Sequence, residues 1–183
     1  MWRPSGAGWP VGSRSGNQPF ERTVSPYVDT LLCEDGVLLF MVAILIGSYN
    51  SLTPTGTTST SGVMMGLGST IKFTPSSTGN VRITITGVVY STGTGTNDTN
   101  VGMELHFGTG TAPANGAAPA GTLISTSWSM DATTGQGNHT FVVDTWKTGF
   151  STGTTYWLDL KLWTGNSSYT AHAWVLTYIV EEI

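Results

Sequence analysis

Residues 81–86 read VRITIT, and in this stretch apolar and polar side chains alternate with a period of two. Side chains on a β-strand point alternately to its two faces, so Val81, Ile83 and Ile85 would share one face. Residues 101–107 (VGMELHF) and 156–163 (YWLDLKLW) alternate in the same way. Each stretch therefore predicts a strand that turns one face towards a core.

Segments of this kind recur along the chain, separated by turn sequences rich in Gly, Pro, Asn, Ser and Thr. No stretch has the 3.6-residue period of an amphipathic helix. The expected strands lie at 37–46, 62–66, 70–74, 80–90, 100–108, 121–130, 139–146, 154–163 and 170–181. We predict an all-β fold, an antiparallel two-sheet sandwich of the jelly-roll type that spans residues 37–183.

The 183-residue chain carries few charges, since Asp, Glu, Lys and Arg make up 10% of it, against about 25% in an average soluble protein. Its net charge of −4 gives it no general electrostatic attraction to nucleic acid or to anionic lipid. The hydrophobic share of 39% is too high for a chain without a core. A single cysteine, Cys33, excludes an intrachain disulfide, so packing or assembly must supply the stability.

Residues 1–36 differ from the rest of the chain. The first 18, MWRPSGAGWPVGSRSGNQ, are rich in Gly, Pro, Ser and Arg and show no period of 2 or 3.6. Such a segment cannot bury a core of its own, which leaves two interpretations: a disordered tail, or an extended arm that lies along a neighbouring subunit. We favour the arm, and we expect scattered aromatic residues to anchor it: Trp2, Trp9, Phe20 and Tyr27.

The longest apolar run, VLLFMVAILI at 37–46, has about ten residues, which is half of what a membrane-spanning helix needs. Glu34 and Asp35 precede it in place of the basic residues of a secretory signal. We therefore predict one long buried strand between Gly36 and Gly47, and neither a signal peptide nor a membrane segment.

Two of the expected strands carry aromatic residues on the face opposite their core face. Apolar residues on both faces of a strand indicate burial on both sides, so we expect a subunit interface in a closed ring such as a trimer. The alternative is that these aromatic residues cap the ends of the sandwich. The interface candidates are Trp157, Trp163, Trp174 and Tyr178.

The sequence lacks the catalytic motifs that are recognised by the spacing of their residues, such as G-x-S-x-G, a Walker-type phosphate loop or H-E-x-x-H. Its histidines, His106, His139 and His172, are far apart, and none has a second ligand at metal-site spacing. Asp159 is expected to form a solvated pair with Lys161, its neighbour on the same strand face. We therefore expect no metal, no cofactor and no enzymatic activity.

Carbohydrate binding stays open as an alternative, because sugar rings stack on exposed aromatic rings and the chain has seven Trp and six Tyr. Trp157 and Trp163 would lie about 20 Å apart on one strand, too far apart for adjacent sugars. We therefore prefer a structural role for these two tryptophans.

Four stretches resemble β-sandwich domains of tailed-phage virion structural proteins: residues 63–75 (VMMGLGSTIKFTP), 79–87 (GNVRITITG), 106–116 (HFGTGTAPANG) and 153–160 (GTTYWLDL). The resemblance covers about residues 60–183 and carries over no catalytic residue. It implies a domain of the capsid decoration or head-fibre type, or one from a tail fibre. It also implies a protein that is made in the host cytoplasm and ends up in the virion.

An extended arm suits a decoration protein, which must hold on to a shell lattice, whereas a fibre tip would show long loops and a repetitive shaft. We therefore expect a non-catalytic protein on the capsid surface, bound to the major capsid protein and to its own copies as a homotrimer. Nucleic acid and membrane are not expected partners. The alternatives are a tail-fibre module that binds a receptor or surface glycan, and a filament subunit that donates a strand to the next copy.

Overall fold

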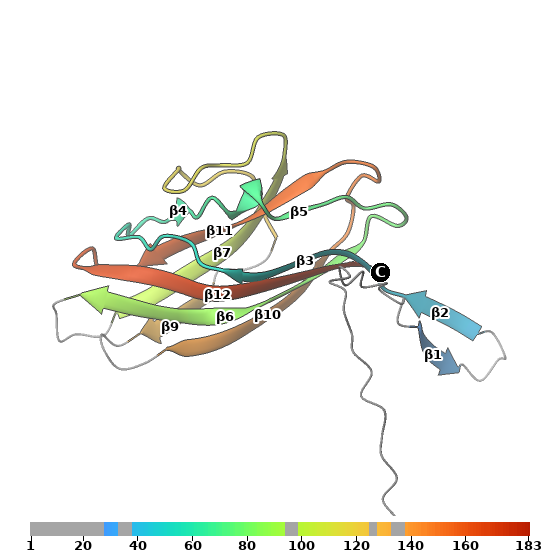
Figure 1. Cartoon of the computed structure of the whole chain (residues 1–183), viewed down its shortest axis with the longest axis horizontal. Coiled ribbons are helices and arrows are strands. Elements are labelled where there is room, and N and C mark those ends of the chain that lie inside the picture. Colours follow the sequence, from blue (N-terminus) through green and yellow to red (C-terminus); the bar gives the residue numbers. More distant parts are fainter. Residues whose placement is uncertain (1–27, 33–37, 94–98, 125–127, 133–137) are drawn as a thin grey trace, which may run out of the picture.

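The computed structural model describes residues 28–32, 38–93, 99–124, 128–132 and 138–183. Within these ranges the chain is built from strands, and its one helical element is a short 3-10 turn, η1 (Leu67–Ser69). Two antiparallel sheets pack face to face (Figure 1). This arrangement confirms the predicted all-β sandwich.

The first sheet, called sheet I here, has four strands in the order β10 (His139–Lys147), β6 (Val81–Gly93), β12 (Tyr169–Glu182) and β3 (Ile44–Leu52). The second, sheet II, is centred on two long strands, β11 (Tyr156–Thr164) and β7 (Thr99–Thr109). Short strands flank this pair: β4 (Val63–Met64) and β5 (Lys72–Phe73) lie beside β11, and β8 (Thr122–Leu123) and β9 (Trp128–Ala132) beside β7.

The strand order is that of a jelly roll. The sandwich has eight strand positions in chain order if β4 and β5 share one position and β8 and β9 share another. Numbered in this way, sheet I reads 6-3-8-1 and sheet II reads 2-7-4-5, so consecutive strands alternate between the sheets except in the 4-5 pair. Such a double wrap of antiparallel strands defines the jelly roll.

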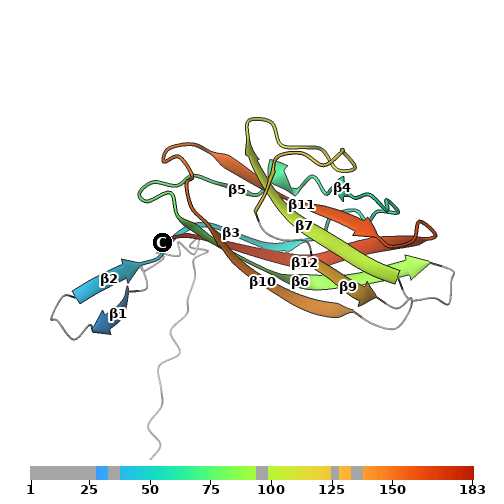
Figure 2. The same cartoon turned by 180° about the vertical axis from the view of Figure 1, so that it is seen from behind.

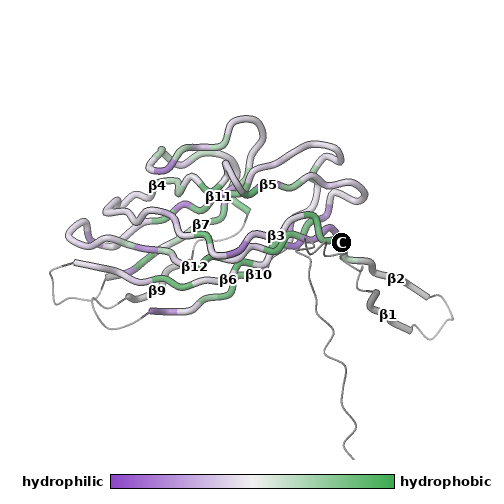
Figure 3. Tube along the Cα trace, in the orientation of Figure 1, coloured by the Kyte–Doolittle hydropathy of each residue, from purple (hydrophilic) through white to green (hydrophobic). Residues whose placement is uncertain are grey.

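The alternation seen in the sequence explains how the two sheets meet. The side chains of Val81, Ile83 and Ile85 point inward from β6, and Leu158, Leu160 and Leu162 point inward from β11, all with 1% exposure or less. Rings of Phe73, Phe150 and Tyr156 close one end of this core, with ring centroids 4.8–5.6 Å apart. In Figure 3 strongly apolar segments lie on strands, among them β10 and the first part of β3.

The apolar run at 37–46 forms two strands and not one, so that prediction is wrong. β2 (Leu38–Val42) pairs with β1 (Val28–Leu32), whereas β3 starts at Ile44 and pairs with β12. The physical reason is the length of β12, whose last paired residue, Glu182, faces Ile44. Residues before Ile44 therefore run past the end of sheet I and pair with the strand that precedes them.

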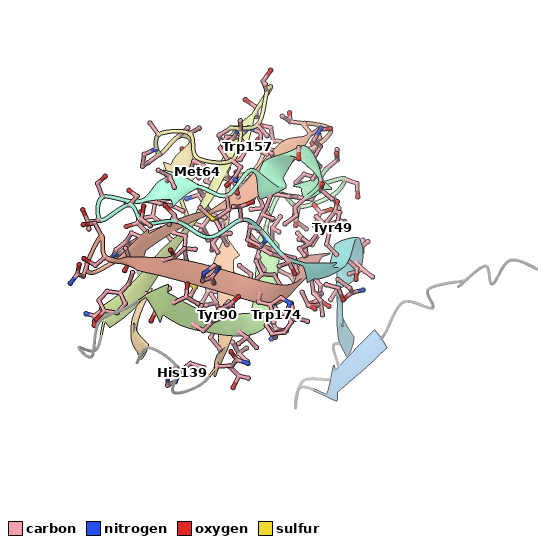
Figure 4. All side chains as sticks on the ribbon, turned by 60° about the vertical axis from the view of Figure 1, so that its left-hand side comes forward. Tyr49, Met64, Tyr90, His139, Trp157 and Trp174 are labelled. Atoms are coloured by element: carbon pink, nitrogen blue, oxygen red, sulfur yellow. The ribbon has the colours of Figure 1, made fainter. Side chains whose placement is uncertain are left out.

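Both faces of β11 are buried, as expected, but the chain itself covers the outer face. The loop at 110–121 crosses over sheet II and joins β4 through two backbone hydrogen bonds, Met64 N–H to the Ala117 carbonyl (2.9 Å) and Gly116 N–H to the Met64 carbonyl (2.8 Å). Trp157 lies under this loop with 4% exposure and donates its indole N–H to the Thr109 carbonyl. Figure 4 shows Trp157 and Met64 together on this side of the sandwich.

Candidate functional site

The outer face of sheet I differs from that of sheet II, because no described segment crosses it (Figure 2). Among the residues whose side chains are described, nine large hydrophobic side chains are exposed, and six of them belong to this face. The two with the largest exposed fraction lie on the edge strand β10: Trp146 is 73% exposed and Val142 is 70% exposed. The other four are Leu45, Trp174, Val175 and Ile179. An apolar surface of this extent is typical of an interaction site.

At one end of this face, a row of four neighbouring residues crosses the whole sheet. The strand register places Trp146 beside Arg82, Arg82 beside Glu181, and Glu181 beside Leu45. Arg82 also donates two hydrogen bonds to Asp144, from Nε to Oδ1 (2.9 Å) and from Nη2 to Oδ2 (2.7 Å), and these hold the pKa of Asp144 below its ordinary value. The row thus combines exposed apolar side chains with internally paired charges.

The same end of the molecule carries the β1–β2 hairpin. Its strands pair in the register Val28 to Val42 and Leu32 to Leu38, and the hairpin stands away from the sandwich beside the C-terminal residue (Figures 1 and 2). Its sequences, VDTLL and LLFMV, contain one charged residue, Asp29. A two-stranded hairpin is at best marginally stable in water, so an apolar one needs a further surface to cover it. We call this region, hairpin and row together, the hairpin end.

Further along the same face, three rings from neighbouring strands form a cluster. The ring of Tyr90 stacks on that of His172 at 4.6 Å and 7°, and the ring of Trp174 meets Tyr90 edge-on at 6.2 Å and 69°. His172 Nε2 lies 3.0 Å from the Thr92 hydroxyl, and partial burial lowers the pKa of His172, which favours the neutral ring at pH 7. Figure 4 shows Tyr90 and Trp174 side by side on this face.

A β-bulge in β12 adjoins this cluster. The register with β6 shifts between Trp174 and Thr177, and Val175 has a φ of 50°. Positive φ is rare for any residue with a Cβ and rarest for β-branched ones, so the backbone here is strained. The extra residue leaves Trp174 and Val175 both exposed, at 43% and 42%, while Leu176 returns to the core. We call Tyr90, His172, Trp174 and Val175 the distal patch.

The structure divides the predicted interface tryptophans and tyrosine into two groups. Tyr178 (0% exposed) and Trp157 are covered by the chain itself, so neither offers a surface to another subunit. Their prediction as interface residues is therefore corrected: both are interior residues of the single chain. Trp163 is partly buried beneath the Lys161 ammonium, 5.0 Å from its ring, and Trp174 is exposed. For these two the interface stays a prediction.

The remaining predicted site residues lie outside the described ranges, and two exposed residues of this face were not predicted. The proposed arm anchors Trp2, Trp9, Phe20 and Tyr27 lie in the part of the chain that the structure does not describe. Val142 and Trp146 on β10 were not among the residues predicted to form a site. Their signal was present, because both alternate with the buried Phe141 and Val143 and so share the outer face.

Asp159 and Lys161 do not form the expected solvated pair. The carboxylate of Asp159 is fully buried and accepts backbone N–H groups of Gly66 (3.1 Å), Leu67 (3.0 Å) and Leu160 (2.8 Å). Burial outweighs these bonds and raises its pKa from 3.8 to about 6. Its geometry is that of an internal brace, which fixes the start of η1 to β11.

Lys161 instead belongs to a network on the outer face of sheet II. Its Nζ donates to Glu104 Oε2 (3.0 Å), the same oxygen that lies 3.1 Å from His106 Nε2. The other ring nitrogen of His106 lies 3.0 Å from the Ala120 carbonyl. These contacts attach the loop at 110–121 to the sheet, so the network is structural.

Glu182 forms the most complete polar cluster. Its Oε1 accepts hydrogen bonds from the backbone N–H groups of Ser77 (2.9 Å), Thr78 (2.6 Å) and Gly79 (2.9 Å). Its Oε2 accepts hydrogen bonds from the backbone N–H (2.7 Å) and the hydroxyl (3.1 Å) of Ser76. Although desolvation opposes ionisation, these hydrogen bonds to the charged form dominate and lower the pKa of Glu182 from 4.5 to about 2. We call this cluster the Glu182 clamp. It ties the end of β12 to the loop that precedes β6.

The described part of the chain contains no helix that is both long and apolar enough to span a membrane. Within the same residues, no group of three or more His, Cys, Asp or Glu side chains could hold a metal ion. Comparison with models of known protein families and with curated proteins finds no match to this chain.

Proposed function

We propose that this chain is a non-catalytic virion structural protein, a decoration protein of the capsid surface. In this proposal the hairpin end attaches to the major capsid protein, and copies of the chain associate as a homotrimer. The jelly-roll body supplies a rigid block, and the N-terminal segment extends the contact across neighbouring subunits. The resemblance of residues 60–183 to tailed-phage virion domains supports this role.

The observation that carries the proposal is the apolar hairpin that stands away from its own sandwich. β1 and β2 pair with each other, and eight of their ten residues are Val, Leu, Phe or Met. Burial of such residues yields roughly 25 cal/mol per Å² of apolar surface, and the two strands form a separate two-stranded sheet. A shell subunit would cover the hairpin, and the exposed Trp146 and Leu45 beside it would enlarge the contact.

The pairing of charges at this end agrees with such a contact. Arg82 is held between Asp144 and Glu181, at 2.7 Å and 3.8 Å, so its charge is already matched inside the chain. Covering the row would therefore not leave an isolated charge without a partner, which is the usual obstacle to burying polar groups. Repetition of the contact over a shell lattice multiplies a modest interface into firm attachment.

The test is co-sedimentation with capsid shells that lack the protein. We compare the wild type with Phe40→Asp, which places a charge in β2, and with Leu123→Asp, a control at an exposed position of β8 on sheet II. Phe40→Asp should reduce occupancy of the shells at least tenfold, whereas Leu123→Asp should bind as the wild type does. Undiminished occupancy with Phe40→Asp would refute the attachment.

A further inference from the structure

The distal patch lies on the same sheet face as the hairpin end but several strand rows away from it. Its members come from the far part of β6 and from β12: Tyr90 is paired with His172, and Trp174 is paired with Val88. The hairpin end lies near Arg82 and Glu181, at the opposite ends of these strands. A decoration protein attached through the hairpin end would therefore leave the distal patch free.

The bulge indicates that the exposure of the patch is built rather than incidental. A regular β12 would place only one of two consecutive residues on the outer face. The strained backbone at Val175 places both Trp174 and Val175 there, and Gly87 on β6 makes room for the displaced Leu176, whose methyl would lie 2.6 Å from any Cβ at that position. Bulges and strained residues cluster at binding sites, where they re-aim side chains.

The rings of the patch are fixed before any ligand arrives. His172 is held by the Tyr90 ring and the Thr92 hydroxyl, and the backbone at Gly56 approaches it so closely that a Cβ there would lie 2.5 Å from the imidazole. Tyr90 in turn supports one side of Trp174. A preorganised ring loses little conformational entropy on binding, which favours affinity.

The chemistry around the patch is neutral and rich in hydroxyl groups. Among the described residues, the charged side chains of this sheet face, Arg82, Asp144 and Glu181, lie in the rows towards the hairpin end. The rows around the patch carry hydroxyl-bearing or apolar side chains: Thr86, Val88, Thr92, Thr140, Thr170 and Thr177. No described Lys or Arg lies in these rows, so the patch does not suit nucleic acid or anionic lipid, both of which need such residues.

We propose that the distal patch binds a neutral saccharide. The C–H face of a sugar ring would stack on the exposed indole of Trp174 and contact the methyl groups of Val175. Sugar hydroxyls would exchange hydrogen bonds with the threonine hydroxyls around the patch. The patch thus offers both kinds of contact that a sugar ring makes, an aromatic face and nearby hydroxyl groups.

The experiment is affinity electrophoresis in native gels that contain dextran, a mannan, a galactan or a β-glucan, with polygalacturonate as an acidic comparison. Full-length wild type and Trp174→Ala are compared with the matched control Trp146→Ala, which removes the more exposed tryptophan at the hairpin end. At least one neutral polysaccharide should retard the wild type and Trp146→Ala. Trp174→Ala should bind at least tenfold more weakly, and polygalacturonate should retard none of them.

Three outcomes would overturn the proposal: no retardation by any of the four neutral polysaccharides, equal retardation of Trp174→Ala, or stronger retardation by polygalacturonate. Sedimentation velocity adds a fourth, because a change of oligomeric state in Trp174→Ala alone would make the patch a contact between copies of the chain. Val175→Gly, which removes the side chain without destabilising the fold, should weaken retardation severalfold. None of these measurements uses capsid shells, so they are independent of the proposed attachment.

Discussion

The Glu182 clamp allows a prediction whose size can be worked out from its hydrogen bonds. Four backbone N–H groups and two hydroxyl groups from Ser76 to Gly79 converge on a carboxylate that is 1% exposed. In Glu182→Gln one oxygen becomes an NH2 group, which faces an N–H donor and can accept nothing from it. A buried donor without an acceptor costs free energy, and a bond to a charged acceptor is lost as well.

The lowered pKa gives the magnitude. A pKa that falls from 4.5 to about 2 corresponds to about 3 kcal/mol of stabilisation of the folded state at neutral pH. Water reaches the exposed Ser76 and Ser77 and screens part of the interaction, so we expect a loss of about 2 kcal/mol for Glu182→Gln. A depressed carboxylate pKa stabilises the fold above pH 4.5, and this stabilisation is lost as the pH falls towards 2. The wild type and Glu182→Gln should therefore converge at low pH.

The assay is urea unfolding followed by tryptophan fluorescence, at a series of pH values from 2 to 7. Glu181→Gln is the matched control, because Glu181 is the preceding residue and lies 3.8 Å from Arg82 at a partly exposed position. We expect the control to change stability by less than about 0.5 kcal/mol. If Glu182→Gln is as stable as Glu181→Gln at pH 7, or if its deficit is the same at every pH, the reasoning about the clamp is refuted.

Two further predictions concern the buried Asp159 carboxylate and the bulge in β12. Burial raises the pKa of Asp159 from 3.8 to about 6, so the wild type should lose about 2 kcal/mol of stability as the pH rises from 4 to 6, whereas Asp159→Asn should not. Urea unfolding over this pH range tests the prediction. The same pH dependence of stability in both proteins would contradict it. Val175→Gly should raise the free energy of unfolding by about 1 kcal/mol because glycine tolerates a φ of 50°. Val142→Gly, at an exposed position of β10 without positive φ, should lower it by about 1 kcal/mol, and a loss in both variants would show that Val175 is not strained.

The sandwich itself could be predicted because its strands bury one face each. The expected strands at 139–146 and 100–108 differ by no more than a residue at either end from β10 and β7. The expected strand at 121–130 is instead two short strands, β8 and β9, that pair with separate parts of β7. Alternation reports burial, but it does not report which partner strand is available.

The same limit explains the other differences. Burial on both faces of β11 was visible in its sequence, but whether a second subunit or the chain itself covers the outer face was not. The answer depends on the contact between Met64 and Ala117, which are 53 positions apart and carry no local signal. The bulge at Val175 was equally hidden, because it depends on the register of β12 against β6.

The jelly-roll wrap has a practical consequence for where foreign sequence can be attached. The hairpin and Ile183 leave the sandwich at one pole, whereas the turn at Gly165–Ser168 between β11 and β12 lies at the other (Figure 1). That turn is exposed and is closed by its own bonds, from Tyr169 N–H to the Asn166 carbonyl and from Ser168 N–H to Asn166 Oδ1. A peptide epitope spliced into it would be displayed far from the hairpin, while a tag fused after Ile183 would crowd the hairpin.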